Sequence, residues 1–133
     1  MNSSGKLFAA TVAVFAATLL TGCGANQPAE ATCERIDDLF DSHDGDLFPS
    51  MKTEDQKAEG VEELKATKGD WEDIAKDAGD DGLAEAMHDM IPVFDAFIDY
   101  GNEDLEDNPN DSVETINTYR SAGSTIDDIC DDF

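Results

Sequence analysis

Basic side chains are scarce in this sequence: its 133 residues include eight Lys and Arg but 32 Asp and Glu, which gives a net charge of −24 at pH 7. A protein that binds nucleic acid needs a basic surface to neutralise phosphates, so this composition excludes nucleic acid as a partner. It also excludes a peripheral amphipathic helix that binds anionic lipids through Lys and Arg. The shortage is most marked between Lys76 and Arg120, where thirteen acidic residues occur without a basic one.

The usual sequence signatures of catalysis are missing as well. The chain has no Gly-x-Ser-x-Gly elbow for a nucleophilic serine, no phosphate-binding loop and no dinucleotide fingerprint. Carboxylates are so abundant that a pair of them carries no specificity for acid–base chemistry. We therefore expect a binding protein rather than an enzyme, and no bound cofactor.

Strand patterns are also missing, since no run of alternating polar and β-branched residues has a convincing length. Apolar residues instead recur at intervals of three and four, the spacing of amphipathic helices. Helices are expected from about Ala29 to Asp41, from Thr53 to about Ala78, from Leu83 to about residue 100, and from Asp111 onward. The predicted fold is all-α, a small antiparallel bundle of about four helices.

Caps and helix breakers refine this pattern. Thr53 followed by Gln56 is a capping box, and Asp111 is expected to cap the last helix. Gly69 weakens the second helix by about 1 kcal/mol relative to Ala, so this helix is either continuous or two pieces joined there. The apolar stripe keeps its phase across Pro92, which predicts one kinked helix. The expected buried face of the last helix comprises Val113, Ile116, Tyr119, Gly123, Ile126, Cys130 and Phe133.

The chain has only one long apolar run, Leu7 to Leu20, which contains no charge, Gly or Pro. Its fourteen residues are too few to span a bilayer, which takes about 20. The run follows a short polar start that contains Lys6, and small residues follow it. This arrangement is typical of a secretory signal peptide.

The residues that end this run, Leu20-Thr21-Gly22-Cys23, resemble the lipobox of bacterial lipoprotein precursors. The resemblance implies cleavage before Cys23, a diacylglycerol thioether on its sulfur and further acylation, such as palmitate, at the new N-terminus. It also implies a protein anchored by lipid on the extracytoplasmic face of the cell membrane. The chain would then comprise a signal peptide (1–22), a tether (23–30) and a helical domain (31–133).

An odd number of cysteines requires one of the three to be unpaired within the chain. If Cys23 carries lipid, Cys33 and Cys130 are the only possible intramolecular pair. Export to an oxidising compartment favours a disulfide between them over two free thiols. This disulfide would join the first helix to the last.

The acidic surface has three interpretations. It is a hydrated surface that keeps the domain soluble, a docking face for a basic protein, or a site for cations. The candidate metal ligands are Glu85, His88 and Asp89, because Glu and His three residues apart share a helix face. Met87 and Met90 lie close to these residues in the sequence and could add soft ligands. As an alternative function, the third helix could therefore capture a metal cation, a haem or a cationic ligand.

A kink at Pro92 would open the packing of the third helix, so we expect a ligand pocket there. The candidate lining residues are Met87, Met90, Pro92, Phe94 and Phe97. The competing interpretation is that these side chains simply fill the core. The sequence thus predicts a lipid-anchored, acidic helical bundle that acts as a binding or interaction module of the cell envelope.

Overall fold

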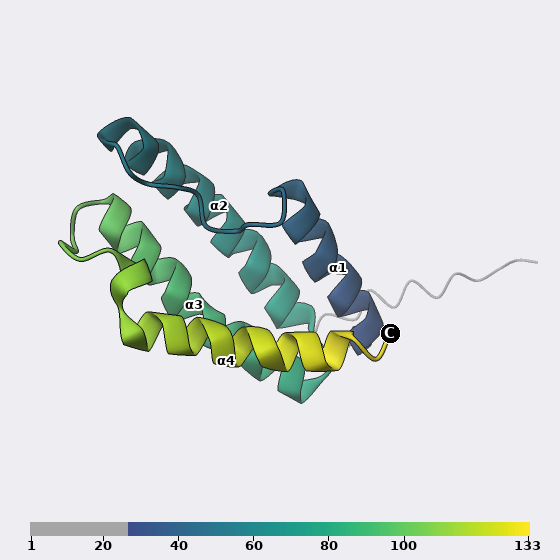
Figure 1. Cartoon of the computed structure of the whole chain (residues 1–133). Coiled ribbons are helices and arrows are strands. Elements are labelled where there is room, and N and C mark those ends of the chain that lie inside the picture. Colours follow the sequence, from purple (N-terminus) through teal and green to yellow (C-terminus); the bar gives the residue numbers. More distant parts are fainter. Residues whose placement is uncertain (1–26) are drawn as a thin grey trace, which may run out of the picture.

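The computed structural model describes residues 27–133, which form four α-helices and one turn of 3-10 helix (Figure 1). The elements are α1 (Ala29–Ser42), α2 (Glu54–Asp77), α3 (Asp81–Gly101), η1 (Pro109–Asp111) and α4 (Val113–Cys130). No strand forms over this range, so the all-α prediction is confirmed. The predicted signal peptide, the lipobox and the first half of the tether (23–26) lie outside the described residues.

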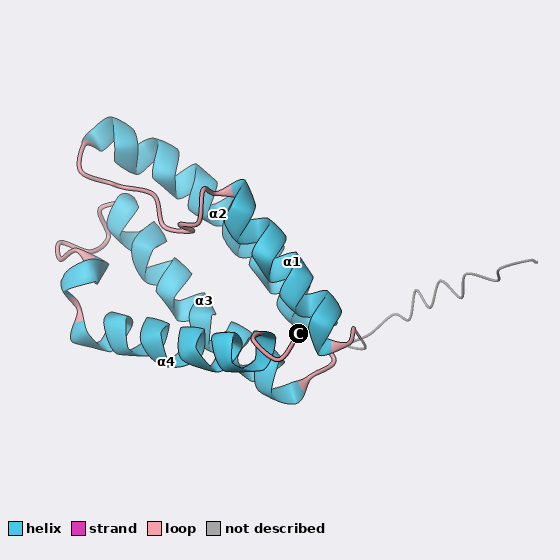
Figure 2. Ribbon diagram, turned by 45° about the vertical axis from the view of Figure 1, so that its right-hand side comes forward, coloured by secondary structure: helices cyan, strands magenta, loops and turns pink. Residues whose placement is uncertain are grey.

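Helix α3 is the centre of the bundle, because it packs extensively against both α2 and α4. Helix α1 lies beside α2, and it approaches α4 only at the end where the chain terminates (Figures 1 and 2). From that end, α1 and α4 diverge in both views. The segment between α1 and α2, residues 43–53, lies on the open side of this angle, where Phe48 meets Tyr119 of α4.

The central position of α3 follows from its sequence, which is the most apolar of the four helices. Its buried side chains are Leu83, Ala86, Met87, Met90, Val93, Phe94, Phe97 and Ile98. Trp71 of α2 packs on this stripe, and its indole N–H donates a 2.8 Å hydrogen bond to the carbonyl oxygen of Met87. The bond satisfies the one polar atom of a side chain that is otherwise buried in the core.

Helix α3 continues through Pro92, as predicted from the phase of its stripe. A proline has no N–H to donate to the carbonyl four residues earlier, which here belongs to His88. Both Pro92 and His88 are exposed, so the unpaired carbonyl lies on the solvent side of the helix. The helix therefore accommodates Pro92 without leaving a polar group in the core.

Helix α2 is continuous from Glu54 to Asp77, so Gly69 does not divide it. Thr53 caps it as predicted, with its side chain accepting a hydrogen bond from the N–H of Gln56. The Gln56 side chain accepts from the N–H of Lys52, one residue before the cap. No helix in residues 27–133 has the length and apolar character needed to cross a membrane.

Helix α4 differs most from the sequence prediction. Its cap is Ser112, which accepts from the N–H of Thr115, whereas Asp111 belongs to the preceding 3-10 turn. The expected buried face is wrong at Val113, Tyr119 and Phe133, which are 72%, 42% and 65% exposed. Only Ala122 and Ile126 of α4 are buried. The first part of α4 diverges from α1, so no helix covers Val113 and Tyr119, and Phe133 lies beyond the helix end at Cys130.

The predicted disulfide between Cys33 and Cys130 is confirmed, and it joins α1 to the end of α4. The two Cα atoms lie 5.6 Å apart although 97 positions separate them in sequence. Closing a loop of that length stabilises a fold by about 4–5 kcal/mol in the chain-entropy treatment. The bridge holds together two helices that share few other contacts.

Two glycines lie in tightly packed surroundings near the start of α2 and the end of α3. A Cβ atom at Gly101 would overlap a methyl group of Val61, and one at Gly60 would lie 2.9 Å from the Met51 side chain. Met51 is itself buried between the two helices. Gly69, in contrast, faces open space on α2.

These surroundings predict opposite effects for the same substitution. Gly69→Ala should raise the free energy of unfolding by about 0.5–1 kcal/mol, because alanine favours the helix and meets nothing. Gly101→Ala should lower it by about 1–3 kcal/mol, because the added methyl group overpacks the interface with Val61. Urea unfolding with the disulfide intact measures both, and a Gly101→Ala variant as stable as the parent would contradict this packing.

Candidate ligand-binding cavity

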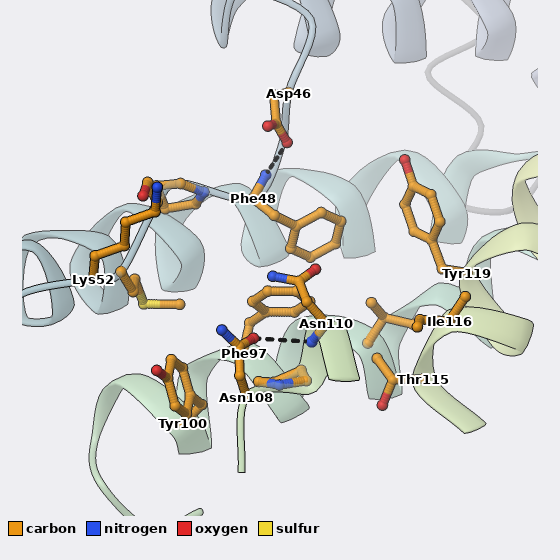
Figure 3. A pocket seen from close by; sticks show the side chains of 15 residues that line it. Asp46, Phe48, Lys52, Phe97, Tyr100, Asn108, Asn110, Thr115, Ile116 and Tyr119 are labelled. Atoms are coloured by element: carbon orange, nitrogen blue, oxygen red, sulfur yellow. Dashed lines mark hydrogen bonds between the residues drawn. The ribbon is translucent and has the colours of Figure 1, made fainter. Parts of the chain in front are cut away.

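A cavity of about 430 Å³ lies between the α1–α2 connection, the second half of α3 and the start of α4 (Figure 3). Its aromatic and apolar lining comprises Phe48, Pro49, Met51, Val93, Phe97, Tyr100, Pro109, Ile116 and Tyr119. Polar residues complete the lining: Asp46, Ser50, Lys52, Asn108, Asn110 and Thr115. A concave, mostly apolar site with a few polar groups is the usual form of a small-molecule pocket, and its volume is within the usual range of about 300–1,000 Å³.

Phe48 forms one wall of this cavity. Its ring centroid lies 4.6 Å from that of Phe97 and 5.0 Å from that of Phe94, and it meets the ring of Tyr119 edge-on at 5.8 Å. Aromatic pairs in this distance range attract each other beyond simple area burial. A side chain from an irregular segment is therefore held in place by rings from α3 and α4.

The backbone of that segment is also held. Leu47 and Met51, on either side of Phe48, are buried in the core. The N–H of Phe48 donates a 2.9 Å hydrogen bond to the Asp46 carboxylate. The turn that leads into the segment has Gly45 at φ +83°, where a residue with a side chain would be strained, and its N–H bonds back to the carbonyl of Phe40. The wall is thus built before any ligand binds.

The opposite rim is formed by Asn108, Pro109 and Asn110. The Asn108 side chain accepts a 2.9 Å hydrogen bond from the N–H of Asn110 and so caps η1. Pro109 is buried, which fixes this turn against the bundle. The side-chain amide of Asn110 extends toward the rings of Phe48 and Phe97 (Figure 3). It can both donate and accept hydrogen bonds, so it is placed to orient a ligand.

Tyr119 stands at one end of the cavity and is partly exposed. Burial raises the pKa of its phenol, and the carboxylates of Asp46 and Asp127 raise it further. A negative potential near a phenol disfavours the loss of its proton. The hydroxyl therefore remains a neutral donor and acceptor well beyond neutral pH.

A second cavity of about 530 Å³ lies in the angle between α1 and α4, next to the disulfide. Trp71 and Met90 contribute to its lining, with Ile36 and Phe40 from α1 and Ile126 and Cys130 from α4. Tyr119 lines this cavity as well as the first one. Its ring thus forms part of the wall between the two.

The structure distributes the five predicted pocket residues differently from the sequence analysis. Phe97 lines the first cavity and Met90 the second, whereas Met87 and Phe94 are completely buried in the core. Pro92 is exposed on α3 and lines neither cavity. The hollow forms beside α3, where α4 diverges, rather than at the proline.

The predicted metal ligands Glu85, His88 and Asp89 are all exposed on α3. Within the described part of the chain, no three His, Cys, Asp or Glu side chains gather as a metal site requires. These three residues therefore do not form such a group. The alternative prediction of a metal-binding third helix gains no support from this geometry.

Several cavity residues were missed by the sequence analysis. Phe48 lies in a segment interrupted by Gly45 and Pro49, where helical periodicity carries no information. Asn108 and Asn110 follow an acidic stretch that indicates only the end of a helix. The one available signal was Tyr119, an aromatic residue between the polar residues Thr118 and Arg120.

Comparison with protein-family models, with curated proteins and with solved structures finds no match to this chain. No relative therefore transfers a function to the cavity.

The electrostatics at Tyr119 predict a measurable titration. Asp46→Asn should lower the pKa of Tyr119, because it removes a negative charge but keeps the oxygen that accepts from the Phe48 N–H. The raised pKa of Tyr119 stabilises the folded state fully below pH 10, and this stabilisation is lost as the pH rises through the pKa that Tyr119 has in the folded state. The Asp46→Asn variant should therefore lose less stability over that pH range. The chain has two tyrosines, so ultraviolet titration in a Tyr100→Phe background isolates Tyr119. An unchanged titration curve would show that Asp46 exerts no field on the phenol.

Proposed function

We propose that this protein is a lipid-anchored binding module of the extracytoplasmic face of the cell membrane, and that its helical domain holds a small ligand in the cavity lined by Phe48, Phe97 and Tyr119. The observation that carries the proposal is the preformed aromatic cavity with polar groups at its rim. A core that only stabilised the bundle would be close-packed, with few voids larger than a water molecule.

The rigidity of the walls supports binding. Phe48 is held by three neighbouring rings and by Asp46, and the rim turn is held by its own cap and by buried Pro109. A preformed site loses little conformational entropy when a ligand enters, which leaves more of the contact energy for affinity. The lining contains no nucleophile–base pair, so we propose binding without chemistry.

The lipid anchor rests on the lipobox resemblance at Cys23. The disulfide between Cys33 and Cys130 supports it, because the bridge uses two of the three cysteines and leaves Cys23 for modification. Two or more acyl chains hold a protein at a membrane, whereas a single chain does so only marginally. The net charge of −24 would repel anionic headgroups, so the lipid rather than the protein surface would make the attachment.

Blocking the cavity tests ligand binding. Benzyl alcohol, benzyltrimethylammonium and benzoate provide one aromatic ring with no charge, a positive charge or a negative charge. At least one of them should shift the amide NMR signals of Phe97, Ile116 and Tyr119 in a saturable manner. Thr115→Trp, which fills the cavity, should weaken this binding at least about tenfold.

The matched control is Thr125→Trp, the same substitution at an exposed position of α4 that does not line the cavity. It should leave binding unchanged. If none of the three compounds shifts these signals at millimolar concentration, or if Thr115→Trp binds as well as Thr125→Trp, the cavity is not a ligand site.

The anchor is tested in bacterial cells that process lipoproteins. Expression of the full chain should place it in the membrane fraction, and mass spectrometry should find a mature N-terminal peptide that begins at Cys23 and carries the lipid mass. Cys23→Ser should remove the lipid and shift the protein to the soluble or unprocessed fraction, while the helical domain keeps its circular dichroism spectrum. Recovery of the wild-type chain with an unmodified Cys23 would overturn the anchoring proposal.

A further inference from the structure

The cavity is built mainly from the part of the chain that has no basic residue. Its lining residues from α3, η1, α4 and the rim turn all lie between Lys76 and Arg120. The connection from α3 to η1, residues 102–108, adds four more carboxylates and no basic group. A cleft surrounded by charges of one sign concentrates ions of the opposite sign. The net charge of −24 therefore gives the chain a negative potential that favours cations over anions.

Asp46 brings a carboxylate to the cavity itself. One of its oxygens accepts the hydrogen bond from the N–H of Phe48, which fixes the carboxylate beside the Phe48 backbone (Figure 3). The other oxygen makes no hydrogen bond within residues 27–133. The negative field is felt locally, since Asp46 is among the groups that raise the pKa of Tyr119.

The rings of the lining suit a cation as well. The faces of Phe and Tyr rings carry partial negative charge and attract ammonium groups within about 6 Å of the ring centre. Tyr100 already shows this interaction, because the ammonium of Lys57 lies 4.8 Å from its ring centroid. Further ring faces line the cavity, those of Phe48, Phe97 and Tyr119.

The only basic residue of the lining is Lys52, and it lies at the opposite end of the cavity from Tyr119 (Figure 3). It is exposed, so its ammonium is largely hydrated. The lining thus has Tyr119 at one end and Lys52 at the other, with the Lys57 ammonium against the ring of Tyr100.

Building on the proposed function, we infer that the ligand of this cavity is an organic cation, a quaternary ammonium or a protonated amine with an apolar body. Its charged head would lie against Phe48 and Tyr119 near Asp46. Its body would lie along Phe97 toward Asn110, whose amide could bond a polar substituent.

Pairs of compounds that differ in charge test this inference. Choline and 3,3-dimethylbutan-1-ol have the same shape, because a carbon replaces the positive nitrogen in the second. Benzyltrimethylammonium and benzyl alcohol form a larger pair. In NMR titrations of the disulfide-bonded domain, the cation of each pair should bind at least about tenfold more tightly than its neutral partner. Sodium chloride should weaken the binding of the cation more than that of the neutral compound.

Four variants locate the charge recognition. Tyr119→Leu keeps an apolar side chain but removes the ring, so it should weaken cation binding several-fold, whereas Tyr119→Phe should not. Asp46→Asn should also weaken it. Lys52→Gln should strengthen it several-fold, because it removes a like charge from the lining. An affinity for cations that Lys52→Gln lowers, or that Tyr119→Leu leaves unchanged, would contradict the placement.

The outcomes separate this inference from the proposed function. If the neutral partner binds as tightly as the cation in whichever pair binds, the cavity is a ligand site but does not select cations, and the inference is overturned. The same holds if benzoate binds more tightly than benzyltrimethylammonium. If no compound binds, both this inference and the proposed ligand binding in the cavity fail.

Discussion

The burial of α3 between α2 and α4 is the constraint on which the rest of the fold depends. A net charge of −24 opposes any compact state, and α3 buries eight residues along its apolar stripe, the most of the four helices. Trp71 packs against this stripe and satisfies its own polar atom on the carbonyl of Met87. Across the same interface, Lys68 donates a 2.6 Å hydrogen bond to Asp95, which raises the pKa of the Lys68 amine and keeps one positive charge among carboxylates.

Helices α2 and α4 both pack on α3. Helix α1 and the α1–α2 connection can therefore pack only where α2 and α4 leave the bundle open. Helix α1 meets α4 only near the disulfide, and the two helices then separate. The connection turns into this angle and places Phe48 against rings from α3 and α4. The two cavities are the spaces on either side of Tyr119, so the hollow parts of the molecule follow from the crossing of α4 rather than from a break in a helix.

Charge and shape act together at the first cavity. The acidic surface is a general property of the chain, and by itself it indicates only solubility. Where aromatic rings line a cavity next to Asp46, the same charge can act on a bound molecule at short range. The proposed recognition of organic cations depends on this conjunction, which neither the rings nor the carboxylates provide alone.

The sequence by itself determined the local properties of this protein: four amphipathic helices, a helix that continues through Pro92, the cap at Thr53 and the disulfide between Cys33 and Cys130. Each depends on residues close together in the chain or on the count of cysteines. Tertiary structure decided which apolar faces are covered, and so it left Tyr119 partly exposed and brought Phe48 beside it. Periodicity reports that a helix has an apolar face, but the crossing angles of its neighbours determine whether that face becomes core or the wall of a cavity.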